Sequence, residues 1–226
     1  MATTYDSQRY ACRCGGVLNK TELNIVGNML HPGDRVLDVG TGTGRFSFMA
    51  ARLATMVMAL DVSRRMILTA YARSTSDRVR GDVSVVIGNG ASLPFADATF
   101  DVVIAVKVLS HFEDIDPFIA ETSRVLRRGG RIVIDVPHQL ASVYQRFIRR
   151  GSIHSYRDYF HSMVEVRTAF RKHSVNLSRR VTYSAVPPSL VHAALCAHPR
   201  LAPSSILQTI IGSRRGLLSF VEGVRL

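Results

Sequence analysis

The stretch VLDVGTGTGR, residues 36–45, decides the fold. An apolar run of strand length ends at Val39, three glycines follow at every second position, and a helical pattern begins at Arg45. Glycines allow a sharp turn and a close approach of a ligand to the main chain, and the free N–H groups at a helix start attract its polar groups. The stretch therefore predicts a strand, a ligand-binding loop and a helix, with the ligand at the carboxyl end of the strand.

The spacing of these glycines excludes two other nucleotide-binding loops. A dinucleotide fingerprint requires G-x-G-x-x-G, but counted from Gly40 the third glycine comes one residue early, and counted from Gly42 the position holds Ser47. The phosphate-loop pattern G-x-x-x-x-G-K-[ST] does not occur in the sequence. A hydride-transferring or nucleotide-hydrolysing enzyme is therefore not indicated.

Around this loop, apolar runs rich in Val and Ile alternate with segments of helical pattern. This alternation predicts an α/β fold with a mostly parallel central sheet and helices on both faces. The predicted strands are residues 35–40, 56–62, 83–88, 100–106 and 131–136. The predicted helices are residues 21–30, with Asn19 and Glu22 as a capping pair, and then 45–53, 64–73 and 117–126.

Beyond Pro137 the pattern is looser. It predicts helices at residues 141–149 and 163–173, a strand at 175–184 and a basic amphipathic stretch from 206 to 225. We expect one domain over residues 1–226. In it, residues 1–32 form an N-terminal cap, 33–137 bind a cofactor, and 138–226 complete the sheet and cover a substrate.

Composition restricts the class of protein. The chain has 226 residues, 46% of them hydrophobic and 20% charged, which is typical of a globular protein. It shows neither an apolar run of about 20 residues nor a secretory leader, and its three cysteines do not suggest a disulfide scaffold. We expect a cytoplasmic protein without an integral membrane segment.

The charge is distributed unevenly along the chain. The net charge is +12, of which +10 falls in residues 138–226 and only +2 before them. An anionic partner such as RNA, a phosphorylated metabolite or a membrane surface would explain this asymmetry. An arginine-rich proteome would explain it equally, because only three of the 29 basic residues are lysines.

Several motifs in order, over about residues 33–137, resemble the class I S-adenosylmethionine-dependent methyltransferases. The loop from Asp38 to Gly44 is similar to their motif D/E-x-G-x-G-x-G, and Asp61 follows at the end of the second strand. GNGASLPF at 88–95 is similar to their G-D-A-x-x-L-P-F, and RVLRRGG at 124–130 to their R-x-L-K-P-G-G. The resemblance is to the small-molecule type, like the methyltransferases of ubiquinone and menaquinone biosynthesis.

The resemblance implies S-adenosylmethionine as cofactor and assigns its contacts residue by residue. Asp61 would accept hydrogen bonds from the ribose hydroxyls and also stands where it could cap the next helix. Asn89 replaces the usual Asp and would accept from the adenine amino group without charge assistance. Asp38 would orient the loop or reach the cofactor amino group through water. The full set of expected cofactor-binding residues is Asp38, Gly40, Thr41, Gly42, Gly44, Asp61, Val62, Met66, Asn89, Gly90, Val106 and Lys107.

His111 is the candidate catalytic residue. In the resembled family, residues leaving the fourth strand line the methionine part of the cofactor, so His111 would lie beside the transferred methyl group as a general base. It could equally only line the pocket. His138 is a second candidate, and Tyr5 and Tyr10 are candidates for a lid. Cys12 and Cys14 lack a second pair of ligands, so no metal is expected.

Three functions remain open on the sequence. The first is methylation of a small molecule at O, N or C. The second is methylation of RNA or another anionic macromolecule, for which the basic C-terminal part would be the binding surface. The third is a cofactor-binding but inactive interaction subunit, whose basic and apolar stretch 201–226 could lie on an acidic membrane. The sequence gives no indication of an oligomeric state.

Overall fold

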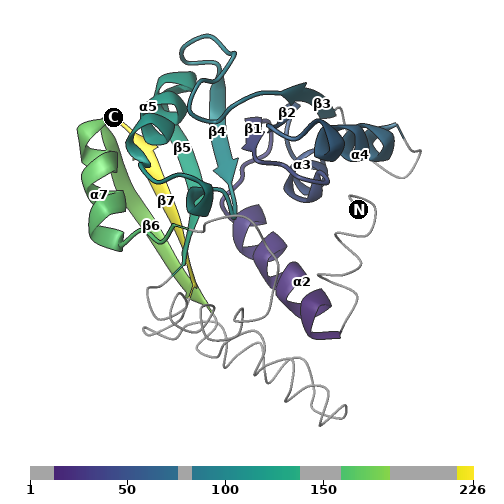
Figure 1. The fold of residues 1–226 in the computed structure, drawn as a ribbon, viewed down its shortest axis with the longest axis horizontal. Helices are drawn as coiled ribbons and strands as arrows, with labels where there is room; N and C mark the ends of the chain where they lie inside the picture. The colour runs from purple at the N-terminus through teal and green to yellow at the C-terminus, as the bar shows by residue number, and fades with distance from the viewer. Residues whose placement is uncertain (1–12, 76–82, 138–158, 184–217) are drawn as a thin grey trace.

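One sheet of seven strands organises the molecule (Figure 1). The computed structural model describes residues 13–75, 83–137, 159–183 and 218–226. The strand order is β3-β2-β1-β4-β5-β7-β6. The first five strands in the chain are parallel, and the last two are antiparallel to their neighbours. The strands are β1 (Arg35–Val39), β2 (Met56–Asp61), β3 (Val83–Ile87), β4 (Phe100–Ala105), β5 (Leu126–Pro137), β6 (Val175–Tyr183) and β7 (Leu218–Arg225).

Helices pack on both faces of the sheet, as the alternating pattern predicted. The described helices are α2 (Arg13–Gly27), α3 (Arg45–Ala50), α4 (Arg64–Ser74), α5 (Asp116–Val125) and α7 (Met163–Lys172), with a short 3-10 helix η1 (Leu109–His111). Phe118 of α5 and Phe170 of α7 belong to the apolar cluster on one face. Val26 of α2 and Phe46 of α3 belong to the cluster on the other. The α/β prediction is therefore confirmed.

Three predicted boundaries differ from the structure. The first described helix begins at Arg13 rather than near residue 21, so Asn19 and Glu22 lie inside α2 and the predicted capping pair is wrong. Strand β5 begins at Leu126, because residues 127–130 form a bulge between its pairing with Phe100 and its pairing with Val102. The first helix after the glycine loop ends at Ala50, three residues earlier than predicted.

The C-terminal part supplies the last two strands. The predicted helix at 163–173 and strand at 175–184 are found as α7 and β6. The predicted amphipathic stretch at 206–225 is wrong from residue 218 onward, because β7 lies between β5 and β6 and buries Phe220 and Val221 completely. Phe220 and Val221 are therefore not available to a membrane surface. The predicted helix at 141–149, the rest of the stretch 201–226 and the candidates Tyr5, Tyr10 and His138 lie outside the described residues.

Within the described ranges, no helix is long and apolar enough to cross a membrane. Strands β6 and β7 belong to the same sheet as the glycine loop's strand β1. That the whole chain is one domain remains a prediction.

Candidate cofactor-binding site

The glycine loop lies where β1 ends and α3 begins. Gly40, Gly42 and Gly44 all have positive φ, of 67°, 58° and 86°. At Gly40 a side chain is also excluded by space, because a Cβ atom would lie 2.4 Å from Cγ2 of Val108. The loop is fastened to the neighbouring strand by the N–H of Thr41, which donates to the carbonyl of Leu60 at 3.0 Å. The part of the prediction that concerns the sharp turn is therefore confirmed.

Asp38 orients the loop from within the core. It is 1% exposed, and its Oδ2 accepts from the hydroxyls of Thr41 at 2.8 Å and Ser47 at 2.6 Å. Burial raises the pKa of Asp38 to about 6, although the two hydroxyl groups favour the charged form and oppose this shift. These contacts connect the end of β1 to the loop and to α3. They match the structural role expected of Asp38.

Asp61 joins two loops at the carboxyl ends of β1 and β2. Its Oδ2 accepts from the N–H of Gly42 at 2.9 Å, and its Oδ1 accepts from the N–H of Ser63 at 2.8 Å. Helix α4 is capped by Ser63, whose hydroxyl accepts from Met66, so Asp61 supports the cap without being the cap residue. Each carboxylate oxygen keeps lone-pair capacity for a further donor. Asp61 can therefore bind a diol beside the glycine loop.

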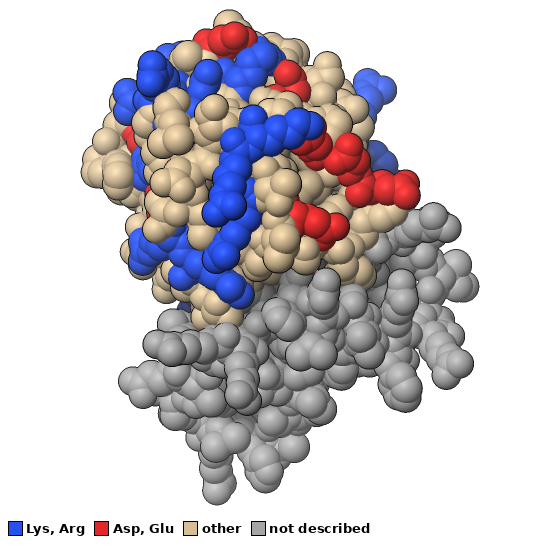
Figure 2. Space-filling model, turned by 90° about the vertical axis from the view of Figure 1, so that its left-hand side faces the viewer, with Lys and Arg blue, Asp and Glu red and all other residues tan. Residues whose placement is uncertain are grey.

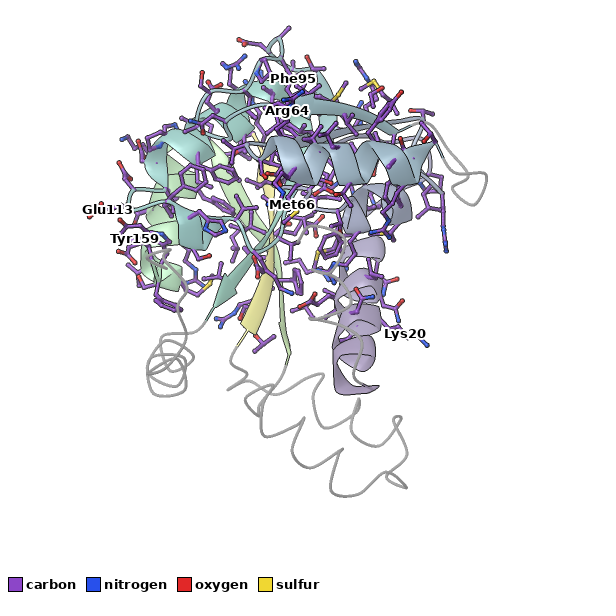
Figure 3. The ribbon with its side chains drawn as sticks, turned by 45° about the vertical axis from the view of Figure 1, so that its right-hand side comes forward. Lys20, Arg64, Met66, Phe95, Glu113 and Tyr159 are labelled. Carbon is purple, nitrogen blue, oxygen red and sulfur yellow. The ribbon has the colours of Figure 1, made fainter. Side chains whose placement is uncertain are left out.

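The residues expected around the adenine come from three elements of the same edge. Val62 directly follows β2 and is 76% exposed, and Met66 lies on the first turn of α4 (Figure 3). Asn89 and Gly90 follow β3. Oδ1 of Asn89 accepts from the N–H of Ala91 at 2.9 Å, which shapes this loop and leaves the carbonyl one further acceptor position. The loop packs closely on β1, because a Cβ at Gly90 would lie 3.0 Å from Val39.

Lys107 leaves β4 in an uncommon backbone conformation, with a φ of 64°. Its N–H donates to Oδ1 of Asp135 at 2.6 Å, and its ammonium group lies 3.0 Å from the carboxylate of Glu22. The same carboxylate lies 2.7 Å from Arg45, the first residue of α3. Glu22 thus connects α2 to the helix that starts at the glycine loop and to the turn that ends β4.

Sequence reasoning missed three of these residues: Glu22 as an ion-pairing residue, Arg45 and Asp135. Glu22 lies 85 residues from Lys107 in the chain, so no local pattern could relate them. Asp135 carried a weak signal, since it is a carboxyl group within an apolar strand. Burial raises its pKa to about 6, opposed by the Lys107 N–H and by the positive charge of Lys107.

His111 is the last residue of η1, and its side chain is exposed. The loop that carries it packs against the glycine loop. Val108, just before η1, lies against Gly40, and Val106 is buried at the end of β4. A second segment runs along the His111 loop: the N–H of Tyr159 donates to the carbonyl of Ser110 at 2.9 Å.

Side chains strengthen this contact between the two segments. The hydroxyl of Tyr159 donates to Glu113 at 3.2 Å (Figure 3), and a ring nitrogen of His161 lies 2.8 Å from the carbonyl of Phe112. His161 is buried. Tyr159 and His161 were not predicted as site residues, and nothing in their local sequence marks them as such.

The predicted residues therefore gather along one edge of the sheet, at the carboxyl ends of β1 to β4. This edge fits an adenosine-containing cofactor. A Cβ built at Gly42 would meet nothing within 4 Å, so space remains beside the N–H groups of the loop and the Asp61 carboxylate. Among the described residues, no three His, Cys, Asp or Glu side chains gather as metal ligands.

Comparison with known proteins agrees with this geometry. Residues 37–134 match the family model of a methyltransferase domain. The chain is 36% identical over 103 residues to the O-methyltransferase rstn1 of Aspergillus nomiae, which covers 45% of this chain and 46% of that protein. It is 39% identical over 104 residues to the demethylmenaquinone methyltransferase of Thermobifida fusca, which covers 46% of this chain and 44% of that one.

A solved structure supports the fold. Magnesium protoporphyrin IX methyltransferase of Synechocystis with bound SAH aligns with a TM-score of 0.66 and 19% identity, over 94% of this chain and 85% of that one. Residues 37–134 are therefore similar to a methyltransferase domain, and the chain has the fold of a methyltransferase solved with bound SAH. The resemblance found in the motifs is confirmed. The chain spans less than half the length of the two relatives.

Proposed function

We propose that the protein transfers a methyl group from S-adenosylmethionine to a small organic acceptor. The observation that carries this proposal is the Asp61 carboxylate, held at 2.9 Å by the N–H of Gly42 beside a loop with open space. When bound, the cofactor supplies an electrophilic methyl group on a sulfonium centre. The chain has to hold the two reactants in line and exclude water.

Each group of expected site residues contacts a different part of the cofactor in this proposal. Asp61 binds the ribose hydroxyls, and Val62 and Met66 pack against the adenine, whose amino group donates to Asn89. Gly40, Thr41, Gly42 and Gly44 let the cofactor approach the backbone, with Asp38 holding the loop from below. Val106 and Lys107 line its amino-acid part. These assignments are expectations from the motifs, and the common edge of the sheet supports them.

We propose that the acceptor presents a hydroxyl group or a carbon acid, with His111 as the general base. Such an acceptor must lose a proton, and an exposed imidazole at the end of η1, in the loop that follows β4, can remove it. The relatives named above, an O-methyltransferase and a demethylmenaquinone methyltransferase, favour this chemistry. The segment Tyr159–His161 would hold the His111 loop in place.

The role of His111 is tested by His111→Asn. We expect this variant to lower kcat by about a hundredfold or more, the usual contribution of a general base, while the affinity for S-adenosylmethionine stays within about twofold. Glu113→Gln, on the same loop, is the matched control and should retain most activity. If His111→Asn keeps the wild-type kcat, His111 only lines the pocket.

The acceptor class is tested with labelled S-adenosylmethionine in a lysate of the source cells. Label in small, organic-soluble products would support the proposal and supply the compound. Label confined to nuclease-sensitive polymer would contradict it and favour an RNA substrate.

A further inference from the structure

The described basic residues of the C-terminal part gather on one side of the molecule. We name this side the basic face and define it by seven residues. They are Arg128 before the main part of β5, Arg167, Arg171 and Lys172 of α7, Arg179 and Arg180 of β6, and Arg225 of β7. All but Arg225 are exposed. Figure 2, which views the side that carries α7 and β6, shows a continuous band of Lys and Arg with acidic side chains toward its borders.

Most of these charges are not neutralised by the protein. Arg167 and Arg171 lie one helical turn apart, and among the described residues no carboxylate is within ion-pair distance of either. Arg179 and Arg180 donate to neutral oxygens, of Asn28 at 3.4 Å and Ser219 at 3.1 Å, and so keep their full charge. Among the seven residues, Lys172 is the one with a described acidic partner, Asp116, at 2.8 Å.

A hollow of about 440 Å³ continues the basic face beyond the end of α7. Arg128, His173 and Arg225 line it, together with Arg124, and no acidic residue is among its described lining residues. The guanidinium of Arg124 is already bonded to Glu121 and Asp97. One terminal nitrogen of the Arg225 guanidinium, Nη1, donates to the carbonyls of Arg124 and Leu126 at the end of α5. The other terminal nitrogen, Nη2, keeps its N–H groups for a ligand. The hollow can therefore receive a phosphate group.

The basic face and its hollow are not part of the cofactor edge. Arg128 and Arg225 lie where β5 begins and β7 ends, at the opposite edge of the sheet from the glycine loop. The hollow and Asp61 lie at opposite ends of the parallel strands, because Arg128 is near the start of β5 and Asp61 is the last residue of β2. This surface is therefore suited to docking the protein rather than to holding the methyl acceptor.

We propose that the basic face docks the protein onto an acidic phospholipid surface. The exposed large apolar side chains on this side of the described structure are aliphatic: Val164 of α7, 72% exposed, and Leu226 after β7, 65% exposed. Proteins that bind single-stranded RNA stack bases on aromatic rings, which the seven described residues of this face do not include. Arginines interspersed with aliphatic side chains instead match the charged headgroups and the outermost apolar layer of a bilayer.

The test compares binding to vesicles of neutral phosphatidylcholine and vesicles with 30% phosphatidylglycerol, by co-sedimentation at low salt. We expect the wild-type protein to bind only the acidic vesicles, and to be released by 0.5 M salt. The double variant Arg167→Gln/Arg171→Gln should bind them about 10- to 30-fold more weakly. Calorimetry of S-adenosylmethionine with the same variant should give wild-type affinity, which shows that it folds and that the two surfaces are independent.

A matched control removes the same charge elsewhere. Arg52 and Arg65 are exposed arginines on the α3 and α4 side of the sheet, outside the basic face. Arg52→Gln/Arg65→Gln should change vesicle binding by less than threefold. An equal loss in both double variants would overturn the proposal, because net charge alone would then explain binding. So would equal binding of the wild-type protein to neutral vesicles, or tighter binding to a duplex RNA that displaces the vesicles.

Discussion

Asp135 is a buried carboxyl group whose ionisation the fold makes unfavourable. It is 3% exposed, and desolvation raises its pKa to about 6 from the 3.8 of a free side chain. The folded protein thus holds this proton more tightly than the unfolded chain does. The stability that results is fully present below about pH 4 and is lost as the pH rises through about 6.

Asp135→Asn tests this pH dependence. The amide cannot ionise, and its carbonyl can still accept from the N–H of Lys107. Between pH 4 and pH 7, the free energy of unfolding of the variant should therefore rise relative to the wild type by an amount on the order of 1–3 kcal/mol. Urea denaturation at the two pH values measures it. A constant difference between the two proteins would show that Asp135 has an ordinary pKa.

The turn at Lys107 explains why the fold contains a buried carboxyl group at Asp135 although its ionisation lowers the stability at neutral pH. A non-glycine residue with a φ of 64° is uncommon and needs support from its surroundings. Asp135 supplies it through the backbone N–H, and Glu22 through the ammonium group. Lys107 begins the loop that carries His111, so both acids position the candidate base from a distance.

At the scale of elements, Glu22 ties α2 to α3 and to the end of β4. Its carboxylate is buried and lies 2.7 Å from Arg45 and 3.0 Å from Lys107. Glu22→Gln removes the negative charge between two cations, and we expect it to lower the free energy of unfolding by about 1–3 kcal/mol.

A double-mutant cycle with Lys107→Met isolates the contact across the two elements. Glu22→Gln, Lys107→Met and the double variant, measured by chemical denaturation, should show a coupling energy of at least about 0.5 kcal/mol. Strict additivity would mean that Lys107 does not hold α2, which would leave the Glu22–Arg45 ion pair and the apolar contacts of Ile25 and Val26.

The sequence predicted those helices and strands that are specified by residues close to one another in the chain. Strands β1 to β4 and helices α4, α5 and α7 were found within one or two residues, because apolar runs, caps and turn glycines mark them along the chain. The glycine loop and Asp61 were predicted for the same reason. Their short separation in sequence mirrors their contact, with Gly42 and Asp61 only 19 residues apart.

The features that the sequence did not predict depend on contacts between residues that are far apart in the chain. Glu22 looked like half of a capping pair, since its real partners Arg45 and Lys107 come from other elements. The stretch after residue 206 looked amphipathic and basic, but from Leu218 it is a strand covered on both sides by β5 and β6. Pairing with two neighbours overrides the local pattern there.

At the scale of the whole molecule, β7 joins the C-terminal part to the cofactor-binding core. Phe220 of β7 is fully buried in the same apolar cluster as Val26 and Phe46. We expect Phe220→Ala to lower the free energy of unfolding by about 3–5 kcal/mol, the usual cost of removing a buried phenyl ring. Leu226→Ala, at an exposed position after the same strand, should stay within about 0.5 kcal/mol. Similar small effects in both would argue against a central β7.

The proposed cofactor edge and the proposed docking surface consist of different residues of one sheet and its helices. The cofactor edge gathers Asp61, the glycine loop and His111 at the carboxyl ends of β1 to β4. The basic face lies across α7 and β6, which follow the core in the chain. The two proposals can therefore be tested separately by mutation.

Calorimetric titration of S-adenosylmethionine into the wild-type protein and Asp61→Ala tests the central claim most directly. The wild type should bind, and the variant should bind about 10- to 150-fold more weakly, because it loses charge-assisted hydrogen bonds worth about 1.5–3 kcal/mol. Asp97→Ala, which removes an exposed carboxylate paired with Arg124, should bind like the wild type. Equal affinities for the wild type and Asp61→Ala, or no binding by the wild type, would contradict the assignment of the cofactor site.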